Sequence, residues 1–286
     1  MDLPRPIFDE LRRLIRGLCG VVLSEDKAYL IRHRLEPVVR DHRLSGFEEL
    51  ARRLRDPGGA ALRDAVVEAI TTGETAFFRD GRPFEAFRRH VLPDLAARRR
   101  RVRLWCAGVA TGQEAYSVAM TVAEFAEANR GRGAGEGTFS ILATDVSARA
   151  LAVARAGEYT RQDAARGLSA AQLARHFEPR GQRWVVREPL RRLVEFRLAN
   201  LMQPFAALGT FDAIFCRNVL IYFDDDTRRR VCAGLRAALA GGGWLLLGSA
   251  ENLYGIADGL ESVRLGDSLF YRRPPRPVAA QPSKPL

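Results

Sequence analysis

The first 70 residues carry apolar side chains at the three- and four-residue spacing that is typical of amphipathic helices. The apolar face of a first helix collects Ile7, Leu11, Leu14, Ile15 and Leu18. Ser24 is a favourable N-cap residue and predicts the start of a second helix. The expected apolar stripe of that helix contains Tyr29, Leu30, Leu35, Val38 and Val39. With two further helices expected over 47–54 and 60–70, residues 1–75 are predicted to form an all-helical domain.

A different pattern begins near residue 101, after a linker and a helix (83–92) that together occupy residues 76–100. Short apolar runs now alternate with segments of helical period, which indicates strands that alternate with helices. The strands are predicted over residues 101–106, 139–145, 193–199, 211–216 and 243–248. Such alternation is typical of an α/β domain with a mostly parallel sheet, here spanning residues 101–273.

One segment is too long for a simple connection between two parallel strands. Residues 157–192 contain a predicted helix over 169–177 and a turn at 179–182 that is followed by a short apolar run. This pattern predicts an inserted subdomain with a small β-hairpin.

The end of the chain is predicted to contain a pair of strands followed by a tail. Residues 260–273 are expected to form two antiparallel strands joined at Gly266 and Asp267. The Pro-rich residues 274–286 lack the apolar content of a core and are predicted to form a disordered tail.

A glycine loop joins the first predicted strand of the sheet to the helix that follows it. Residues 105–117 read Trp-Cys-Ala-Gly-Val-Ala-Thr-Gly-Gln-Glu-Ala-Tyr-Ser. Gly108 and Gly112 allow a ligand to approach the backbone, and free amides at the start of a helix suit a polar or anionic group. The Gly-x-x-x-Gly spacing is not the dinucleotide fingerprint, so an ordinary strand-to-helix turn explains the loop equally well.

Polar side chains follow two other predicted strands, at the edge where open α/β sheets bind ligands. Asp145 ends one strand, where such sheets place an acid that accepts hydrogen bonds from ribose hydroxyls. The same aspartate is also suited to cap the helix that begins near Ser147. Arg217, Asn218 and Tyr222 follow a later strand and are expected to converge on the crevice of the glycine loop. The alternative for Tyr222 is an ordinary amphipathic core tyrosine.

The composition is that of a soluble globular protein, with 47% hydrophobic and 28% charged residues. No apolar run approaches the roughly 20 residues that span a bilayer, and the N-terminus lacks the apolar region of a signal peptide. We therefore expect a cytoplasmic protein without membrane insertion. The cysteines are widely separated and form no Cys-x-x-Cys: Cys19, Cys106, Cys216 and Cys232. They are predicted to be buried free thiols, and neither a disulfide framework nor a metal site is indicated.

The net charge of +11 and the pI near 10.3 raise the question of a nucleic-acid partner. Residues 1–75 contain 13 basic and 13 acidic side chains, whereas residues 76–103 contain nine basic and three acidic ones. The excess is concentrated around Arg98–Arg101 and Arg103, where no aromatic residue interleaves with the arginines to form a stacking surface. A solvated basic face explains this charge, and no nucleic-acid partner is expected.

Several motifs follow one another along the chain. They are Thr-Thr-x-x-Thr-x-Phe-Phe-Arg at 71–79, Ala-Thr-Gly-x-Glu-x-Tyr-Ser at 110–117, Ala-Thr-Asp at 143–145, Ala-Arg-x-Gly-x-Tyr at 154–159, Asn200-Leu201, and Phe-Cys-Arg-Asn-Val-x-Ile-Tyr-Phe at 215–223. None of them is specific by itself. In this order, and with a match that runs from about residue 7 to residue 273, the chain resembles the chemotaxis receptor methyltransferases of the CheR type.

The resemblance implies a Rossmann-like S-adenosylmethionine-dependent methyltransferase sheet, with an N-terminal all-helical domain and a small inserted β subdomain. It also implies methyl transfer from S-adenosylmethionine to glutamate side chains of membrane chemoreceptors, which gives γ-methyl esters and S-adenosylhomocysteine. By position in the motifs, the implied cofactor contacts are Thr75, Arg79, Ala107, Glu114, Asp145, Asn200, Leu201, Arg217 and Asn218. Arg79 and Tyr222 are implied to lie near the reacting methyl group as the catalytic pair, and no metal is implied.

The chain departs from the family pattern at three places. Gly73 stands where the family usually has an asparagine that contacts the cofactor. Gln113 and Ala115 replace a usual glutamate and proline, although the acid at position 114 is retained. The hairpin turn over 178–183 is shorter than in family members that tether to a receptor's C-terminal pentapeptide. We therefore expect this chain to act independently of such a peptide.

The resemblance implies that the partner is the cytoplasmic helical region of chemoreceptors, and we expect the enzyme to be a monomer. A basic part of the helical domain contains Arg32, Arg34, Arg40 and Arg43. These arginines either contact acidic receptor helices or form a solvated face. The alternative function is an S-adenosylmethionine-binding or receptor-docking module with weak or no catalysis. A nucleic-acid methyltransferase is disfavoured, because the sequence has neither an Asn/Asp-Pro-Pro-aromatic motif nor a Pro-Cys nucleophile.

Overall fold

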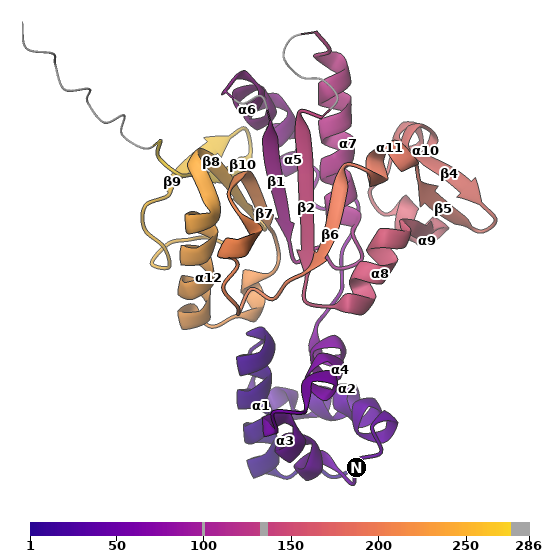
Figure 1. Ribbon diagram of the computed structural model, residues 1–286, viewed down its shortest axis with the longest axis vertical. Coiled ribbons are helices and arrows are strands. Elements are labelled where there is room, and N and C mark those ends of the chain that lie inside the picture. The colour runs from indigo at the N-terminus through magenta and orange to yellow at the C-terminus, as the bar shows by residue number, and fades with distance from the viewer. Residues whose placement is uncertain (99–100, 132–136, 276–286) are drawn as a thin grey trace, which may run out of the picture.

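The N-terminal part of the chain is a bundle of four α helices, which lies below the α/β domain in Figure 1. The computed structural model describes residues 1–98, 101–131 and 137–275. The helices of the bundle are α1 (Arg5–Cys19), α2 (Ala28–Asp41), α3 (Phe47–Arg55) and α4 (Ala60–Ile70). Their apolar faces form a separate core that includes Leu11, Ile31, Leu50 and Val66. The predicted all-helical domain is therefore confirmed.

The start of α2 differs from the prediction. Ser24 precedes a 3-10 turn (Glu25–Lys27), its side chain caps none of the described backbone amides, and the α helix begins only at Ala28. Tyr29, which we expected on the buried stripe, is 70% exposed, whereas Ile31 is fully buried. Because a 3-10 turn has a different period from an α helix, the periodicity counted from Ser24 assigned the wrong face to the first turn.

The α/β domain is built on a seven-stranded sheet with the order β6-β2-β1-β7-β8-β10-β9. Its strands are β1 (Val102–Ala107), β2 (Phe139–Asp145), β6 (Val194–Leu198), β7 (Phe211–Cys216), β8 (Leu239–Leu247), β9 (Glu261–Leu265) and β10 (Ser268–Arg272). Neighbouring strands from β6 to β8 are parallel, whereas β10 is antiparallel to both β8 and β9. This is the mostly parallel sheet with an antiparallel end that the sequence predicts.

The largest boundary error among the strands of the main sheet concerns β8. This strand begins at Leu239, four residues before the predicted start at residue 243. Gly241, Gly242 and Gly243 stand near its beginning, and glycines contribute no side chain to an apolar pattern. Hydrophobicity therefore does not reveal the first part of β8, although its backbone pairs with β7 from Phe211 onward.

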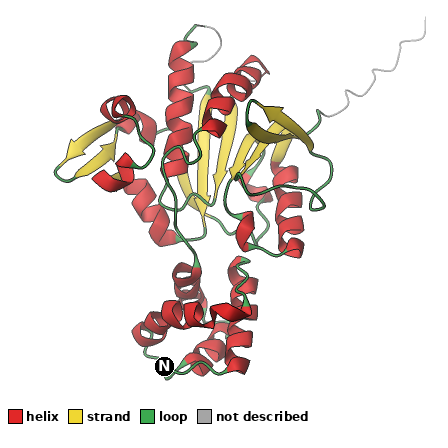
Figure 2. Cartoon of the chain, turned by 180° about the vertical axis from the view of Figure 1, so that it is seen from behind, coloured by secondary structure: helices red, strands yellow, loops and turns green. Residues whose placement is uncertain are grey.

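Helices cover both faces of the sheet (Figures 1 and 2). One face packs on α5 (Arg82–Ala86), a π-helical turn (Phe87–Val91), α6 (Leu92–Arg98), α7 (Gln113–Ala128) and α8 (Ala148–Ala156). The other face packs on α12 (Asp225–Ala238) and the 3-10 turn Ala206–Leu208. Along β1, Leu104 and Cys106 belong to the first core, whereas Trp105 and Ala107 belong to the second. Packing on both faces fixes β1, and with it the glycine loop that follows.

The inserted subdomain lies between α8 and β6. It contains a three-stranded antiparallel sheet with the order β3-β5-β4. Its elements are β3 (Glu158–Thr160), α9 (Arg161–Ala165), α10 (Ala170–His176), β4 (Phe177–Arg180), β5 (Arg183–Val186) and α11 (Glu188–Arg191). Strands β4 and β5 are the predicted hairpin, whereas β3 was missed because three residues show no usable alternation. Tyr159 of β3 is buried, and its ring centroid lies 4.9 Å from that of Phe77 in the linker.

The four cysteines are buried free thiols, as the sequence predicts. None of the helices in the described residues is long and apolar enough to cross a membrane. In the same part of the chain, no group of three or more His, Cys, Asp or Glu side chains is arranged to hold a metal ion. Residues 276–286 of the predicted Pro-rich tail lie outside the described residues, and so do Arg99 and Arg100 of the basic run.

Candidate functional site

A cavity of about 600 Å³ lies between the helical domain and the α/β domain. The arrows of β1 and β2 point toward the helical domain in Figure 1, so the cavity is at the carboxyl edge of the sheet. Its wall includes the predicted site residues Thr75, Arg79, Glu114, Asp145, Asn200, Leu201, Arg217, Asn218 and Tyr222. Ala107 is the exception, because it is fully buried at the end of β1 and is not part of the wall. The parallel order of the strands brings these distant residues to one edge.

The sequence of the glycine loop after β1 is compatible with a ligand-binding loop or with an ordinary strand-to-helix turn, and the structure shows features of both. Gly108 and Gly112 have left-handed backbone conformations, with φ of 76° and 94°. A Cβ at Gly112 would lie 2.7 Å from the Cβ of Ala154, so the approach of the loop to α8 requires glycine. Gly108, Ala110 and Thr111 also line the cavity. The loop is thus a tightly packed turn and, at the same time, a wall of the cavity.

Asp145 connects the glycine loop to the segment before α8. Its Oδ2 accepts a hydrogen bond from the Ala110 N–H at 2.7 Å, and its Oδ1 accepts one from the Ser147 N–H at 2.9 Å. Ser147 itself caps α8 by accepting from the Ala150 N–H, so the capping alternative for Asp145 is wrong. Burial raises the pKa of Asp145, and the backbone donors oppose that shift. Each carboxylate oxygen has a further acceptor position, which leaves Asp145 able to accept from a ligand hydroxyl.

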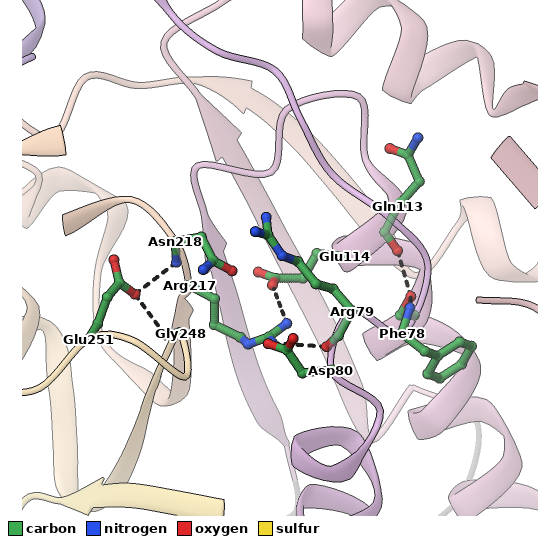
Figure 3. A network of polar contacts seen from close by, with 10 residues as sticks. Phe78, Arg79, Asp80, Gln113, Glu114, Arg217, Asn218, Gly248 and Glu251 are labelled. Carbon is green, nitrogen blue, oxygen red and sulfur yellow. Dashed lines mark hydrogen bonds and ion pairs between the residues drawn. The ribbon is translucent and has the colours of Figure 1, made fainter. Parts of the chain in front are cut away.

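Arg217 is held by the protein itself. Its side chain is fully buried, and Nη1 donates to Glu114 Oε2 at 3.1 Å. Nη2 donates to Asp80 Oδ2 at 2.6 Å and to the backbone carbonyl of Arg79 at 2.9 Å (Figure 3). The guanidinium also lies 5.4 Å from the ring centroid of Phe84, within cation–π distance. These contacts assign Arg217 to the framework of the cavity wall.

The two polar residues at the start of α7 have different environments. Glu114 lines the cavity, is 8% exposed and is paired with Arg217. Burial raises the pKa of Glu114, and the charge of Arg217 opposes this effect. Gln113 is not part of the cavity wall, and its Oε1 accepts a hydrogen bond from the Thr111 hydroxyl at 2.8 Å. Gln113, which stands where the family usually has a glutamate, therefore faces the glycine loop and not the cavity.

Arg79 projects from a tight turn in the linker. Phe78, Asp80 and Gly81 have φ of 46°, 68° and 58°, and the Gly81 N–H donates to the Phe78 carbonyl at 2.7 Å. Ser117 fixes the start of this turn by accepting from the Phe78 N–H at 2.8 Å. Within the described residues, the Arg79 guanidinium makes no hydrogen bond or ion pair, and Figure 3 shows it beside Glu114. A cationic group is thus held at the cavity with no hydrogen bond or ion pair among the described residues, and its charge acts on the nearby Glu114, where it opposes the rise in pKa.

Backbone strain is concentrated around the cavity. The described residues other than glycine that have positive φ are Arg43, Phe78, Asp80, Ala110 and Asn218. Phe78 and Asp80 flank Arg79, and Ala110 and Asn218 line the cavity. Such conformations cost roughly 1–3 kcal/mol each and persist where the surrounding structure enforces them. Their location supports the assignment of this cavity as the functional site.

Asn218 and Tyr222 lie in the segment between β7 and α12. Asn218 has a φ of 58°, and its N–H donates to Glu251 Oε2 at 2.8 Å. Tyr222 ends a 3-10 turn (Leu220–Tyr222), and its carbonyl accepts from the Val22 N–H of the helical domain at 2.8 Å. Because Tyr222 is only partly buried and lines the cavity, the core alternative for this tyrosine is wrong.

Contacts between the domains form another side of the site. Asn200 Nδ2 donates to the Leu18 carbonyl at 2.6 Å, while its Oδ1 accepts from the Met202 N–H. Glu68 of α4 accepts from the Ser147 hydroxyl at 2.7 Å and from the Arg149 N–H at 3.0 Å. The side chain of Asn200 therefore joins the two domains at the wall where a cofactor contact was predicted.

Arg34 does not belong to the exposed basic face that the sequence suggested. Its Nη1 donates to the Ile70 carbonyl and its Nη2 to the Thr72 hydroxyl, so it anchors the linker to α2. Arg34 also lines the cavity, whereas Arg32, Arg40 and Arg43 are exposed.

The sequence reasoning missed three carboxylates that shape the site: Glu68, Asp80 and Glu251. Asp80 directly follows Arg79, and its pairing with Arg217 depends on a contact across 137 positions. Glu251 follows β8 at the same sheet edge as Asn218, so its position after a parallel strand was an available signal. Glu68 acts between domains, and no local pattern identifies such a contact.

Comparison with known proteins agrees with this geometry. The family described as "CheR methyltransferase, SAM binding domain" matches residues 73–266, and "CheR methyltransferase, all-alpha domain" matches residues 6–71. The chain is 42% identical over 266 residues to Chemotaxis protein methyltransferase 1 of Vibrio cholerae, a match that covers 93% of this chain and 96% of that protein. It is 40% identical over 268 residues to Chemotaxis protein methyltransferase 1 of Pseudomonas aeruginosa, with 93% and 97% covered. The chain belongs to the CheR methyltransferase family, whose all-helical and S-adenosylmethionine-binding domains it contains.

Proposed function

We propose that this S-adenosylmethionine-dependent methyltransferase of chemotaxis methylates glutamate side chains of chemoreceptors and forms γ-methyl esters. The observation that supports this most directly is Arg79, a cavity-lining guanidinium that makes no hydrogen bond or ion pair with the described residues. Such a group suits an anionic substrate, because it orients a carboxylate by a charge-assisted, two-pronged hydrogen bond.

The cavity fits the cofactor in size and in chemistry. Its volume of about 600 Å³ lies within the range of small-molecule sites, roughly 300–1,000 Å³. Asp145 offers acceptor positions for ribose hydroxyls, while Leu201 provides apolar contact and Asn218 an amide. We assign these residues, together with Thr75 and Glu114, to cofactor binding. Asn200 and Arg217 support the same wall through their contacts with Leu18 and Glu114.

The proposed chemistry requires no general base. When bound, S-adenosylmethionine supplies a methyl group on an electrophilic sulfonium centre. A glutamate carboxylate is already ionised at pH 7, because its ordinary pKa is near 4.3. The protein therefore contributes by aligning the carboxylate. Arg79 holds its oxygens, and the Tyr222 hydroxyl donates a hydrogen bond to the same group.

The partner follows from the same proposal. The substrate glutamates belong to the cytoplasmic helical region of membrane chemoreceptors, so the enzyme works in the cytoplasm, and we propose that it is a monomer. The exposed Arg32, Arg40 and Arg43 supply positive charge for acidic receptor helices. In the hairpin, Arg180 pairs directly with Arg183, which leaves a two-residue turn. So short a turn supports independence from a C-terminal receptor pentapeptide, and binding of such a peptide in calorimetry would contradict it.

Methyl transfer to receptors from the same cell is the decisive experiment. Purified enzyme and radiolabelled S-adenosylmethionine are offered receptor membranes and, in parallel, RNA. We expect label on the receptors that is released by mild base, as for a carboxyl ester, and none on RNA. Binding of S-adenosylhomocysteine without any transfer would favour the alternative, a binding or docking module without turnover.

A further inference from the structure

Glu251 is a buried carboxylate whose described hydrogen bonds all come from backbone amides. Its residue is 6% exposed. Oε2 accepts from the Gly248 N–H at 2.7 Å and from the Asn218 N–H at 2.8 Å, and Oε1 accepts from the Ile221 N–H at 3.1 Å. No ion pair with Glu251 is present among the described residues, so these donors compensate its burial.

The three amides belong to the two segments that follow β7 and β8. Asn218 has a strained backbone, and Ile221 is the central residue of the 3-10 turn that ends at Tyr222. Gly248 follows β8, and a Cβ there would lie 2.8 Å from both Asn218 Nδ2 and Glu251 Oε2. The carboxylate therefore fixes the Asn218–Tyr222 segment against β8 at two points, Asn218 and Ile221, of which Figure 3 shows the contact with Asn218.

We infer that Glu251 is a positioning residue for methyl transfer, holding Asn218 for the cofactor and Tyr222 for the substrate carboxylate. Glu251 itself is not part of the cavity wall, so it acts through these two residues. This role rests on the proposed function for Tyr222, whereas the role toward Asn218 needs only cofactor binding.

The unequal use of the two oxygens makes a selective substitution possible. In Glu251→Gln, the carbonyl oxygen of the new amide can retain the bonds from Asn218 and Gly248. The amide nitrogen then faces the Ile221 N–H, donor against donor. In the opposite orientation, the amide nitrogen would face two N–H donors, those of Asn218 and Gly248, so this orientation is disfavoured. Glu251→Gln therefore disturbs the Tyr222 turn and spares Asn218, whereas Glu251→Ala releases both.

The experiment measures S-adenosylhomocysteine affinity by calorimetry and receptor methylation at saturating S-adenosylmethionine, below the unfolding temperature of each variant. For Glu251→Gln we expect affinity within threefold of the wild type and a kcat at least tenfold lower. For Glu251→Ala we expect at least tenfold losses in both. Unchanged kcat in Glu251→Gln, or equal losses of kcat and affinity in that variant, would overturn the inference. If Glu251→Ala fails to fold, the kcat and affinity of Glu251→Gln alone test the inference.

Asp212→Asn is the matched control. Asp212 is a buried carboxylate at the beginning of β7, and its Oδ2 accepts from the Arg103 N–H at 2.9 Å. This amide substitution is expected to lower the unfolding temperature without changing kcat or affinity. If the wild type methylates no receptor, the proposed function fails, but the affinity of Glu251→Ala still tests the inference. Unchanged affinity in that variant would then overturn it, and a tenfold loss would support it.

Discussion

Two sides of the cavity are built in opposite ways. The inner wall comprises Glu114, Arg217 and Asn218, which are held by the pairing of Arg217 with Glu114 and by the bond from Asn218 to Glu251. The linker wall comprises Gly73, Glu74, Thr75 and Arg79, of which Thr75 and Arg79 make no side-chain hydrogen bond with the described residues. The inner wall is thus part of the fold, whereas the linker wall presents the side chains of Thr75 and Arg79 to a ligand.

Within one cavity, the inner wall therefore contributes to stability and the linker wall to function. The two walls meet where the Arg79 carbonyl accepts from Arg217, so the buried arginine fixes the backbone from which the free arginine projects. Substitutions in the inner wall should therefore reduce stability, and through it binding. Substitution of Thr75 or Arg79 in the linker wall should change binding or methyl transfer while stability stays the same.

Arg217→Met tests the inner wall and has the largest expected effect. Methionine fills similar space but leaves the buried Glu114 carboxylate without its ion-pair partner. Removing one partner of a buried ion pair costs about 3–5 kcal/mol, so urea unfolding should show a loss of that size. Affinity for S-adenosylhomocysteine should fall as well, because Glu114 is a wall residue.

Arg82→Met is the control for Arg217→Met. Arg82 pairs with Asp267 at 3.3 Å, and both side chains are more than 70% exposed. A surface pair of this kind contributes about 0–1 kcal/mol, so stability should hardly change. A similarly small loss for Arg217→Met would break the distinction between the two walls.

Arg79→Ala tests the linker wall and should act on the reaction. Loss of charge-assisted hydrogen bonds worth about 1.5–3 kcal/mol should lower kcat/KM for the receptor by about 100-fold. Because Arg79 makes no side-chain bond within the described structure, unfolding in urea should be unchanged. The affinity for S-adenosylhomocysteine, measured by calorimetry, should fall only a few-fold.

Arg79→Lys is the companion variant, since it keeps the charge but loses the planar fork. We expect methylation between that of Arg79→Ala and that of the wild type. If Arg79→Ala lost cofactor affinity and methylation to the same extent, the substrate-orienting role of Arg79 would be refuted.

The sequence predicts the scaffold of this site well, for a physical reason. Parallel strands buried on both faces give apolar runs that are easy to recognise, and their carboxyl ends meet at one edge. Asp145 and Asn218 follow such runs, so their meeting at the cavity was predictable from the strand assignment. The resemblance to the methyltransferase family added their roles.

The direction of individual side chains was not predictable in the same way. Arg217 follows a strand just as Asn218 does, yet it points inward, because Glu114 and Asp80 pair with it from elements far along the chain. Asn200 bonds to the Leu18 carbonyl only because the two domains pack together. Contacts of this kind depend on tertiary packing and leave no periodic signal.

Gly73→Asn should have the smallest effect and tests the linker wall at the position where this chain departs from the family. Gly73 lines the cavity, and a Cβ there would meet only the Cβ of Ala110, at 4.0 Å, among the described atoms. An asparagine side chain therefore has room to point into the cavity. One additional hydrogen bond contributes about 1 kcal/mol, which predicts up to about a tenfold gain in S-adenosylmethionine affinity.

Gly73→Ala separates the amide from the backbone effect of losing glycine. Alanine alone should raise stability by about 0.4–1 kcal/mol through the unfolded chain, with no gain in cofactor affinity. Asparagine should give a similar change in stability and the additional gain in affinity, measured by calorimetry. An asparagine variant that binds no more tightly than the alanine variant would mean that the linker wall does not contact the cofactor at position 73. The wall would then act on the substrate alone, through Arg79.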